Sequence, residues 1–174
     1  TYAMGSPVTT KPGTAAWSRQ DNETDRPVSK LKAEALEHAA NADLIIYVGG
    51  ITPAQEGEGF DRDSIELPEV QSQLLRALYA AGKPIVMVNC SGSAIALTWE
   101  DEHLPAILQA WYPGQNGGQA VAEVLFGEIN PSGHLPITFY RATSDLPDFR
   151  NYSMENRTYK YFQGKPLYAF GHGL

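Results

Sequence analysis

The chain has 174 residues, 43% of them hydrophobic, and its 13 Lys and Arg against 20 Asp and Glu leave a net charge of −7. This hydrophobic share excludes a disordered chain, and an acidic chain without a basic stripe is a poor candidate for nucleic-acid binding. The apolar runs are far shorter than the roughly 20 residues that span a bilayer, so we expect no membrane insertion. The single cysteine, Cys90, excludes an internal disulfide framework.

The first 27 residues differ in composition from the rest of the chain. They hold three prolines, several threonines and the polar run at 19–26, with only short apolar pieces. Such composition is typical of loops. We therefore predict that residues 1–27 form an extended or loop segment that packs on a neighbour, and that residues 28–174 form one domain.

From Val28 onward, helical and strand patterns alternate. Apolar residues recur with a period near 3.6 in the helical segments, while short apolar runs closed by glycine or proline indicate strands, the first of them buried on both faces. Ser29 is placed to cap the first helix. The expected helices start at Val28 and lie at 68–81, around 95–99 and at 116–126, and the expected strands lie at 43–50, 83–90 and around 106–111.

Towards the C-terminus the helical patterns stop. The segments 135–140 and 157–162 alternate or are rich in aromatic residues, which predicts strands at a sheet edge. The fold class is therefore α/β: a three-layer sandwich with a mostly parallel, flavodoxin-like doubly wound sheet and an antiparallel edge strand near the C-terminus. Because the chain opens with loop-like sequence instead of a strand, we expect the fold to be incomplete at its N-terminal end.

The loop after the first strand, residues 50–64, is the longest and holds four carboxylates, one arginine and three glycines. In open parallel sheets, ligands bind at the loops that follow the strands. Glu58 lies between two glycines, where the backbone bends sharply and another surface approaches closely. A carboxylate pushed into a partly apolar pocket has a raised pKa and can act as a general acid. The alternative is a solvated acidic loop in which Arg62 pairs with Asp61 or Glu58.

Other catalytic or binding classes lack their motifs. The chain has no Gly-x-Gly-x-x-Gly or Gly-x4-Gly-Lys-Ser/Thr for nucleotides and no Gly-x-Ser-x-Gly for a serine hydrolase. Its four histidines are not paired at metal-ligand spacing, so we expect neither a metal nor a cofactor. These histidines are His38, His103, His134 and His172.

Seven motifs in order resemble the second domain of glycoside hydrolase family 3. The first reads Glu56-Gly57-Glu58-Gly59-Phe60-Asp61-Arg62, and another begins Trp111-Tyr112-Pro113-Gly114. The resemblance covers about residues 42–174, and His134 and His172 depart from it, standing where an arginine and an aromatic residue are common. The motifs lie at 56–62, 65–71, 111–120, 124–127, 130–139, 156–162 and 168–174.

The resemblance implies a retaining β-glycosidase, mostly a β-glucosidase or β-xylosidase, with its two catalytic groups on different domains. A barrel domain supplies an aspartate nucleophile, and the α/β domain lends a glutamate as acid/base. Carried over by motif, this glutamate is Glu58, with Glu56 as the alternative. Arg62 and Trp111 are further candidates for contacting the sugar, although bracing the loop and packing are the commoner uses of such residues.

The barrel is absent from these residues, so we expect this chain alone to be inactive. The resemblance implies that it acts with the barrel domain of the same enzyme on β-linked oligosaccharides, releasing terminal glucose or xylose. It also suggests a periplasmic or secreted enzyme. One alternative is a non-catalytic carbohydrate-binding or interaction module derived from the same domain. A nucleotide-binding flavodoxin-like domain is a further alternative, which rests on fold class alone.

Overall fold

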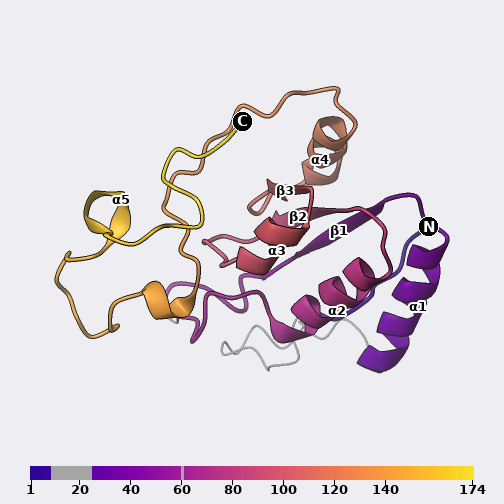
Figure 1. Ribbon diagram of the computed structural model, residues 1–174, viewed down its shortest axis with the longest axis horizontal. Helices are drawn as coiled ribbons and strands as arrows, with labels where there is room; N and C mark the ends of the chain where they lie inside the picture. The colour runs from indigo at the N-terminus through magenta and orange to yellow at the C-terminus, as the bar shows by residue number, and fades with distance from the viewer. Residues whose placement is uncertain (9–24, 60) are drawn as a thin grey trace.

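The computed structural model describes residues 1–8, 25–59 and 61–174. Strands and helices alternate from residue 28, as predicted, and the three strands form one parallel sheet in the order β1-β2-β3. The α/β class and the parallel sheet are thereby confirmed (Figure 1). The elements are α1 (Val28–Ala40), β1 (Ile45–Gly50), α2 (Glu69–Ala80), β2 (Ile85–Cys90), α3 (Thr98–His103), β3 (Ala106–Gln109), α4 (Gly117–Leu125), the 3-10 helix η1 (Thr143–Asp145) and α5 (Thr158–Tyr161).

The main core lies between the sheet and the helices α1 and α2. Alternate residues of the strands point to this side, among them Tyr47 of β1 and Met87 of β2, which is fully buried. They meet the apolar stripe of α2, where Leu75 is also fully buried. In the view of Figure 1, α1 and α2 lie below the strands and α4 lies above them.

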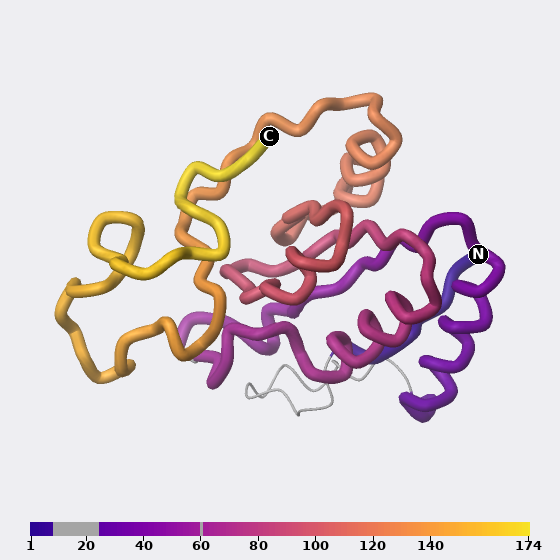
Figure 2. Tube along the Cα trace, in the orientation of Figure 1, coloured from indigo at the N-terminus to yellow at the C-terminus, as the bar shows by residue number. Residues whose placement is uncertain are grey.

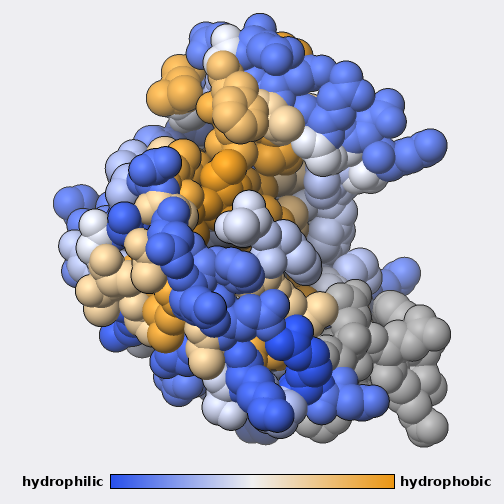
Figure 3. All heavy atoms as spheres, turned by 90° about the vertical axis from the view of Figure 1, so that its right-hand side faces the viewer, coloured by the Kyte–Doolittle hydropathy of each residue, from blue (hydrophilic) through white to orange (hydrophobic). Residues whose placement is uncertain are grey.

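The opposite face of β1 is open, which the sequence did not predict. Ile46 is 44% exposed and Val48 is 65% exposed, so the expectation of a strand buried on both faces is wrong. Figure 3 shows apolar side chains gathered in a hollow on the side of the molecule that lies at the right of Figure 1. Within the described residues, this face of β1 is therefore apolar and only partly covered.

The C-terminal segments differ most from expectation. Residues 158–161 form the short helix α5 instead of part of a strand, because the Arg157 guanidinium binds three nearby carbonyl oxygens, those of Asp148, Asn151 and Ser153. These local bonds favour a compact turn over an extended strand.

The predicted antiparallel edge strand is not part of the described sheet. Segment 135–140 instead contacts the C-terminal end of the chain, through an isolated antiparallel bridge between Phe139 and Tyr168. The Leu135 amide also donates to the His172 carbonyl, at 2.8 Å. Figure 2 shows the two segments running side by side.

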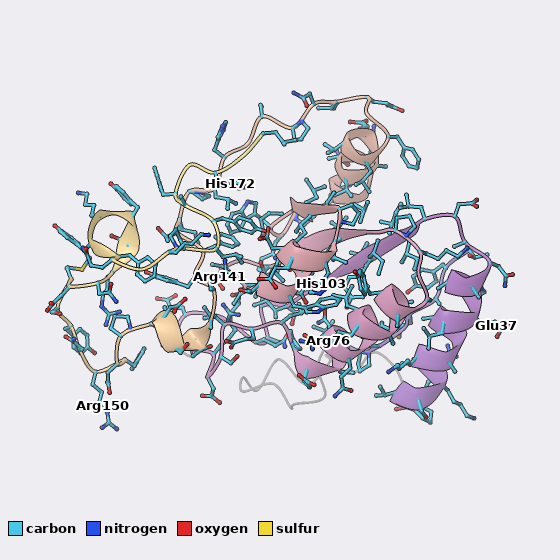
Figure 4. All side chains as sticks on the ribbon, viewed as in Figure 1. Glu37, Arg76, His103, Arg141, Arg150 and His172 are labelled. Atoms are coloured by element: carbon cyan, nitrogen blue, oxygen red, sulfur yellow. The ribbon has the colours of Figure 1, made fainter. Side chains whose placement is uncertain are left out.

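Helix α3 begins later than predicted, at Thr98, because the residues before it are tied to the loop that follows β1. The Ala96 amide donates to the Ile65 carbonyl at 2.8 Å. Helix α3 itself packs on α2. Within α3, His103 stacks on Trp99 with ring centroids 4.5 Å apart. The guanidinium of Arg76, which belongs to α2, lies 5.3 Å from the centroid of the Trp99 ring. Figure 4 labels Arg76 and His103 where these two helices meet.

The described part of the first 27 residues lies against α2. Gly5 adopts φ +67°, and a Cβ there would come within 2.6 Å of Leu74 Cδ2. Most of the polar run at 19–26 lies outside the described residues, so packing of the whole segment on a neighbour stays a prediction. Ser29 makes no cap of α1, whose N-cap residue is Pro27.

Gln71 of α2 holds the end of β1 in place. Its side chain is buried, and Oε1 accepts from the Gly50 amide at 2.9 Å and from the Tyr47 hydroxyl at 3.3 Å. Nε2 donates to the carbonyls of Gly50 and Val8, each at 2.6 Å. The side chain thus uses its full hydrogen-bonding capacity, and it fixes the residue from which the long loop departs.

Replacing Gln71 by alanine is expected to lower the free energy of unfolding by about 1–3 kcal/mol for each buried backbone group left unpaired. Urea and thermal unfolding of the purified protein measure the loss. The matched control is Gln73→Ala in the same helix, because Gln73 is exposed and its side chain donates only to Glu69. Equal effects of the two substitutions would contradict the role given to Gln71.

Candidate functional site

The long loop between β1 and α2 starts beside the turn that follows β2. Gly50, the last residue of β1, pairs with Cys90 at the end of β2. It adopts φ +128°, and Cys90 leaves no room for a side chain there. A Cβ there would lie 1.9 Å from the Cys90 carbonyl oxygen. This close approach places Ile51 next to Cys90, and Glu56 and Arg62 of the loop contact the turn at 91–94.

Glu56 is the most heavily bonded carboxylate of this loop. Its Oε1 accepts from the Gly92 amide and from the Tyr112 hydroxyl, each at 2.6 Å. Its Oε2 accepts from the Ser93 hydroxyl and lies 3.9 Å from Nε of Arg62. Only 15% of the Glu56 side chain is exposed, so these three donors and the Arg62 guanidinium replace most of its contact with water.

The absence of a side chain at Gly92 makes this arrangement possible. A Cβ at Gly92 would lie 2.7 Å from Cε2 of Tyr112 and 2.8 Å from Oε1 of Glu56. Burial, followed by the hydrogen bond to Glu56 and the charge of that carboxylate, raises the pKa of Tyr112. The phenol therefore remains a neutral donor over the whole physiological range.

Arg62 holds the other end of the same segment. Its Nη2 donates to the Ser93 hydroxyl at 2.8 Å and to the Ala94 carbonyl at 3.0 Å. Burial lowers the pKa of Arg62, while the Glu56 charge opposes that change. The predicted pairing of Arg62 with Asp61 or Glu58 is wrong, since the ion pair found in the described chain is with Glu56.

Glu58 lies between these two anchors and is exposed. Its carboxylate makes no hydrogen bond or ion pair with the part of the chain that the structure describes. Gly59 follows with φ +87° and open space around it. The structure therefore brings Glu56 and Arg62 together and leaves Glu58 on the surface, where a group from outside this domain can reach it.

Glu66 ties the end of the loop to the C-terminal half of the chain. Its carboxylate accepts from the Thr143 amide at 2.8 Å and from the hydroxyls of Thr143 and Ser64. Burial alone would raise the pKa of Glu66, but these hydrogen bonds outweigh burial and lower the pKa to about 2. Motif matching alone did not single out this contact, which spans 77 residues of sequence.

Trp111 lies in a different place from Glu58 and Arg62. It adopts φ +55°, packs edge-to-face on Phe139 at 6.3 Å, and lines a groove of about 650 Å³ that also contains Tyr168 and His172. The described lining of this groove includes Trp111, but none of residues 51–59 and 61–64 and therefore not Arg62.

No three His, Cys, Asp or Glu side chains among residues 1–8, 25–59 and 61–174 lie close enough to hold a metal ion. In the same ranges, no helix has the length and apolar composition to cross a membrane.

Comparison with protein families identifies one match that spans nearly the whole chain. Residues 3–174 match the glycosyl hydrolase family 3 C-terminal domain. The resemblance read from the motifs is thereby confirmed.

Individual relatives carry glycosidase names. The chain is 52% identical to a xylan 1,4-beta-xylosidase of Xylanibacter ruminicola, over 81% of this chain and 17% of that protein. It is 35% identical to a periplasmic beta-glucosidase of Salmonella typhimurium, over 99% of this chain and 25% of that protein. The solved structure of a beta-glucosidase from Kluyveromyces marxianus matches with a TM-score of 0.78 and 32% identity, over 87% of this chain and 20% of that one. The chain thus spans a quarter or less of the length of these relatives.

The Glu66 contacts predict a pH-dependent stability. Because its pKa is lowered in the fold to about 2, this carboxylate stabilises the protein fully above its ordinary pKa of 4.5, and the contribution is lost as the pH falls towards 2. Glu66→Gln is therefore expected to lower the unfolding midpoint in urea at pH 7 and to have a progressively smaller effect between pH 4.5 and 3. The control is Glu128→Gln, at an exposed position after α4. A Glu66→Gln effect that does not change with pH would contradict the assignment.

Proposed function

Because the chain belongs to glycosyl hydrolase family 3, whose C-terminal domain it matches over residues 3–174, we propose that it is the acid/base-bearing domain of a retaining β-glycosidase. The proposed acid/base is Glu58. The proposed substrates are oligosaccharides that end in β-linked xylose or glucose, in keeping with the names of the relatives.

The observation that supports Glu58 is its contrast with Glu56. A general acid must be free to approach the leaving oxygen and to exchange a proton with it. Glu56 accepts hydrogen bonds from three donors and faces a guanidinium, so protonation or movement would break contacts that it already makes. Glu58 is exposed and flanked by glycines. The geometry therefore favours Glu58 over Glu56 as the acid/base.

Retaining hydrolysis requires two carboxyl groups about 5–5.5 Å apart, on either side of the glycosidic bond. In the proposed mechanism, an aspartate of the barrel domain attacks the anomeric carbon while Glu58 donates a proton to the departing oxygen. Glu58 then removes a proton from the water that cleaves the glycosyl-enzyme intermediate. An acid on an exposed loop suits this division, because the sugar is held mainly by the other domain.

The proposed partner is therefore the barrel domain of the same polypeptide. Large exposed aromatic side chains between η1 and the C-terminus support an extensive contact, since such surfaces commonly mark interfaces. Phe149 is 74% exposed and Tyr152 is 90% exposed, and both precede the half-exposed Tyr159 of α5. A periplasmic or secreted location for the whole enzyme is part of the proposal, supported by the name of the Salmonella relative.

Glu58→Gln in the full-length enzyme is expected to lower kcat/KM for aryl β-xylosides or β-glucosides with poor leaving groups by about 10²–10⁴-fold. Substrates with an activated leaving group need little protonation and should lose far less. Azide attacks the glycosyl-enzyme intermediate without the help of a general base. It should therefore restore turnover of these activated substrates and form a glycosyl azide. If azide rescues Glu56→Gln instead, the acid/base is Glu56.

This 174-residue chain by itself is expected to release no 4-nitrophenol from 4-nitrophenyl β-xyloside or β-glucoside, because the proposed nucleophile belongs to the other domain. Addition of the separately purified barrel domain tests whether activity needs both parts. Hydrolysis by this chain alone would contradict the proposed division of the catalytic groups.

A further inference from the structure

We propose that Glu56 is a positioning residue for Glu58: its carboxylate holds the first half of the loop on the ends of β2 and β3, so that Glu58 is presented from a fixed base. This inference rests on the proposed role of Glu58 as acid/base. It gives Glu56 a function that requires no contact with substrate.

The contacts of Glu56 join three parts of the chain that are distant in sequence. Gly92 and Ser93 lie in the turn after β2, 36 and 37 residues away, and Tyr112 follows β3, 56 residues away. Both strands end at the same edge of the parallel sheet, so their following residues form a rigid platform there. A single carboxylate thus attaches the loop to two neighbouring strand ends.

Arg62 attaches the loop a second time to the same platform. It binds Ser93 and Ala94, and Glu56 binds Gly92 and Ser93, so the short segment that contains Glu58 has both ends held at one turn. Such a short closed segment has few conformations compared with one that is free at one end. The two anchors thereby restrict where Glu58 lies.

Apart from these two anchors, the described residues show no contact that holds Glu58. Its carboxylate has no hydrogen-bond partner in the described ranges, and a Cβ added to the glycine that follows it would meet none of their atoms within 4 Å. Each residue of extended chain spans at most about 3.3–3.6 Å, so releasing Glu56 would let Glu58, two residues along, move by several ångströms. A misplacement of about 1 Å can cost about 10²-fold in rate.

The experiment uses the full-length enzyme and the variants Glu56→Ala and Tyr112→Phe. The readout is kcat/KM for aryl glycosides whose leaving groups range from methoxyphenol to 2,4-dinitrophenol, which reports the first chemical step. A misplaced acid protonates the leaving-group oxygen poorly. Glu56→Ala is therefore expected to lower kcat/KM about 10²-fold for the methoxyphenyl glycoside and less than about threefold for the dinitrophenyl glycoside. Tyr112→Phe should show the same trend with a smaller loss, since it removes one of the three hydrogen-bond donors to Glu56.

Further variants separate positioning from stability. Glu56→Gln keeps an oxygen to accept from Gly92 and Tyr112, so it should recover part of the loss seen with Glu56→Ala. Glu102→Gln is the matched control, because Glu102 is an exposed carboxylate that also pairs with an arginine, at 3.2 Å from Arg141. It should leave the leaving-group dependence unchanged. Thermal unfolding of each variant identifies any that do not fold, and Tyr112→Phe still provides the test if Glu56→Ala fails to fold.

Three outcomes would overturn the inference. One is an equal loss for all leaving groups, which indicates a structural role only. Another is unchanged kinetics in Glu56→Ala and Tyr112→Phe. The third is azide rescue of Glu56→Gln, which would make Glu56 itself the acid/base. The proposed function is tested separately: if Glu58→Gln shows neither leaving-group dependence nor azide rescue, the role of Glu58 fails whatever the Glu56 variants do.

Discussion

The Glu56 carboxylate is the contact on which the geometry of this site depends. It receives hydrogen bonds from the turn after β2 and from Tyr112 after β3, and it faces Arg62 from its own loop. Its desolvation is offset because three neutral donors bind it and a charged guanidinium lies 3.9 Å away. Without it, the backbone amide of Gly92 and the phenol of Tyr112 would both lose their acceptor. The loop and the ends of two strands therefore form one unit.

The loop is also held at its beginning and end, by different chemistry. Gln71 binds both backbone groups of Gly50, where the loop leaves β1, and Glu66 binds Thr143, where the loop approaches α2. The parts near the sheet are thus fixed by hydrogen bonds to side chains as well as by backbone contacts, such as the parallel bridge between Glu66 and Ala96. What remains exposed is the short stretch around Glu58. Rigidity at the base and exposure at the tip are both consequences of where these polar partners lie.

The order of elements from Val28 to α4 followed from hydrophobic periodicity, because burial of one helix stripe or strand face is a local property of sequence. The same signal does not say what covers the second face of a strand, so the exposure of Ile46 and Val48 was missed. Segment 157–162 looked like a strand because it is aromatic, whereas the hydrogen bonds of Arg157 to nearby carbonyls favour a turn. The motif identified Glu58 and Glu56 as candidates, but the partner of Arg62 depends on contacts across the sheet that spacing does not reveal.

Two carboxylates separated by one glycine have opposite environments here, and this difference suits the proposed division of the active site. In an extended strand, residues i and i+2 point to the same side. The flexible backbone at Gly57 and Gly59 removes that constraint, so Glu56 turns into the domain while Glu58 stays at the surface. A single glutamate cannot both hold the loop through three hydrogen-bond donors and move a proton to an oxygen outside the domain. In the proposed mechanism the two tasks are separated, because Glu56 stays fixed by its contacts while Glu58 is exposed.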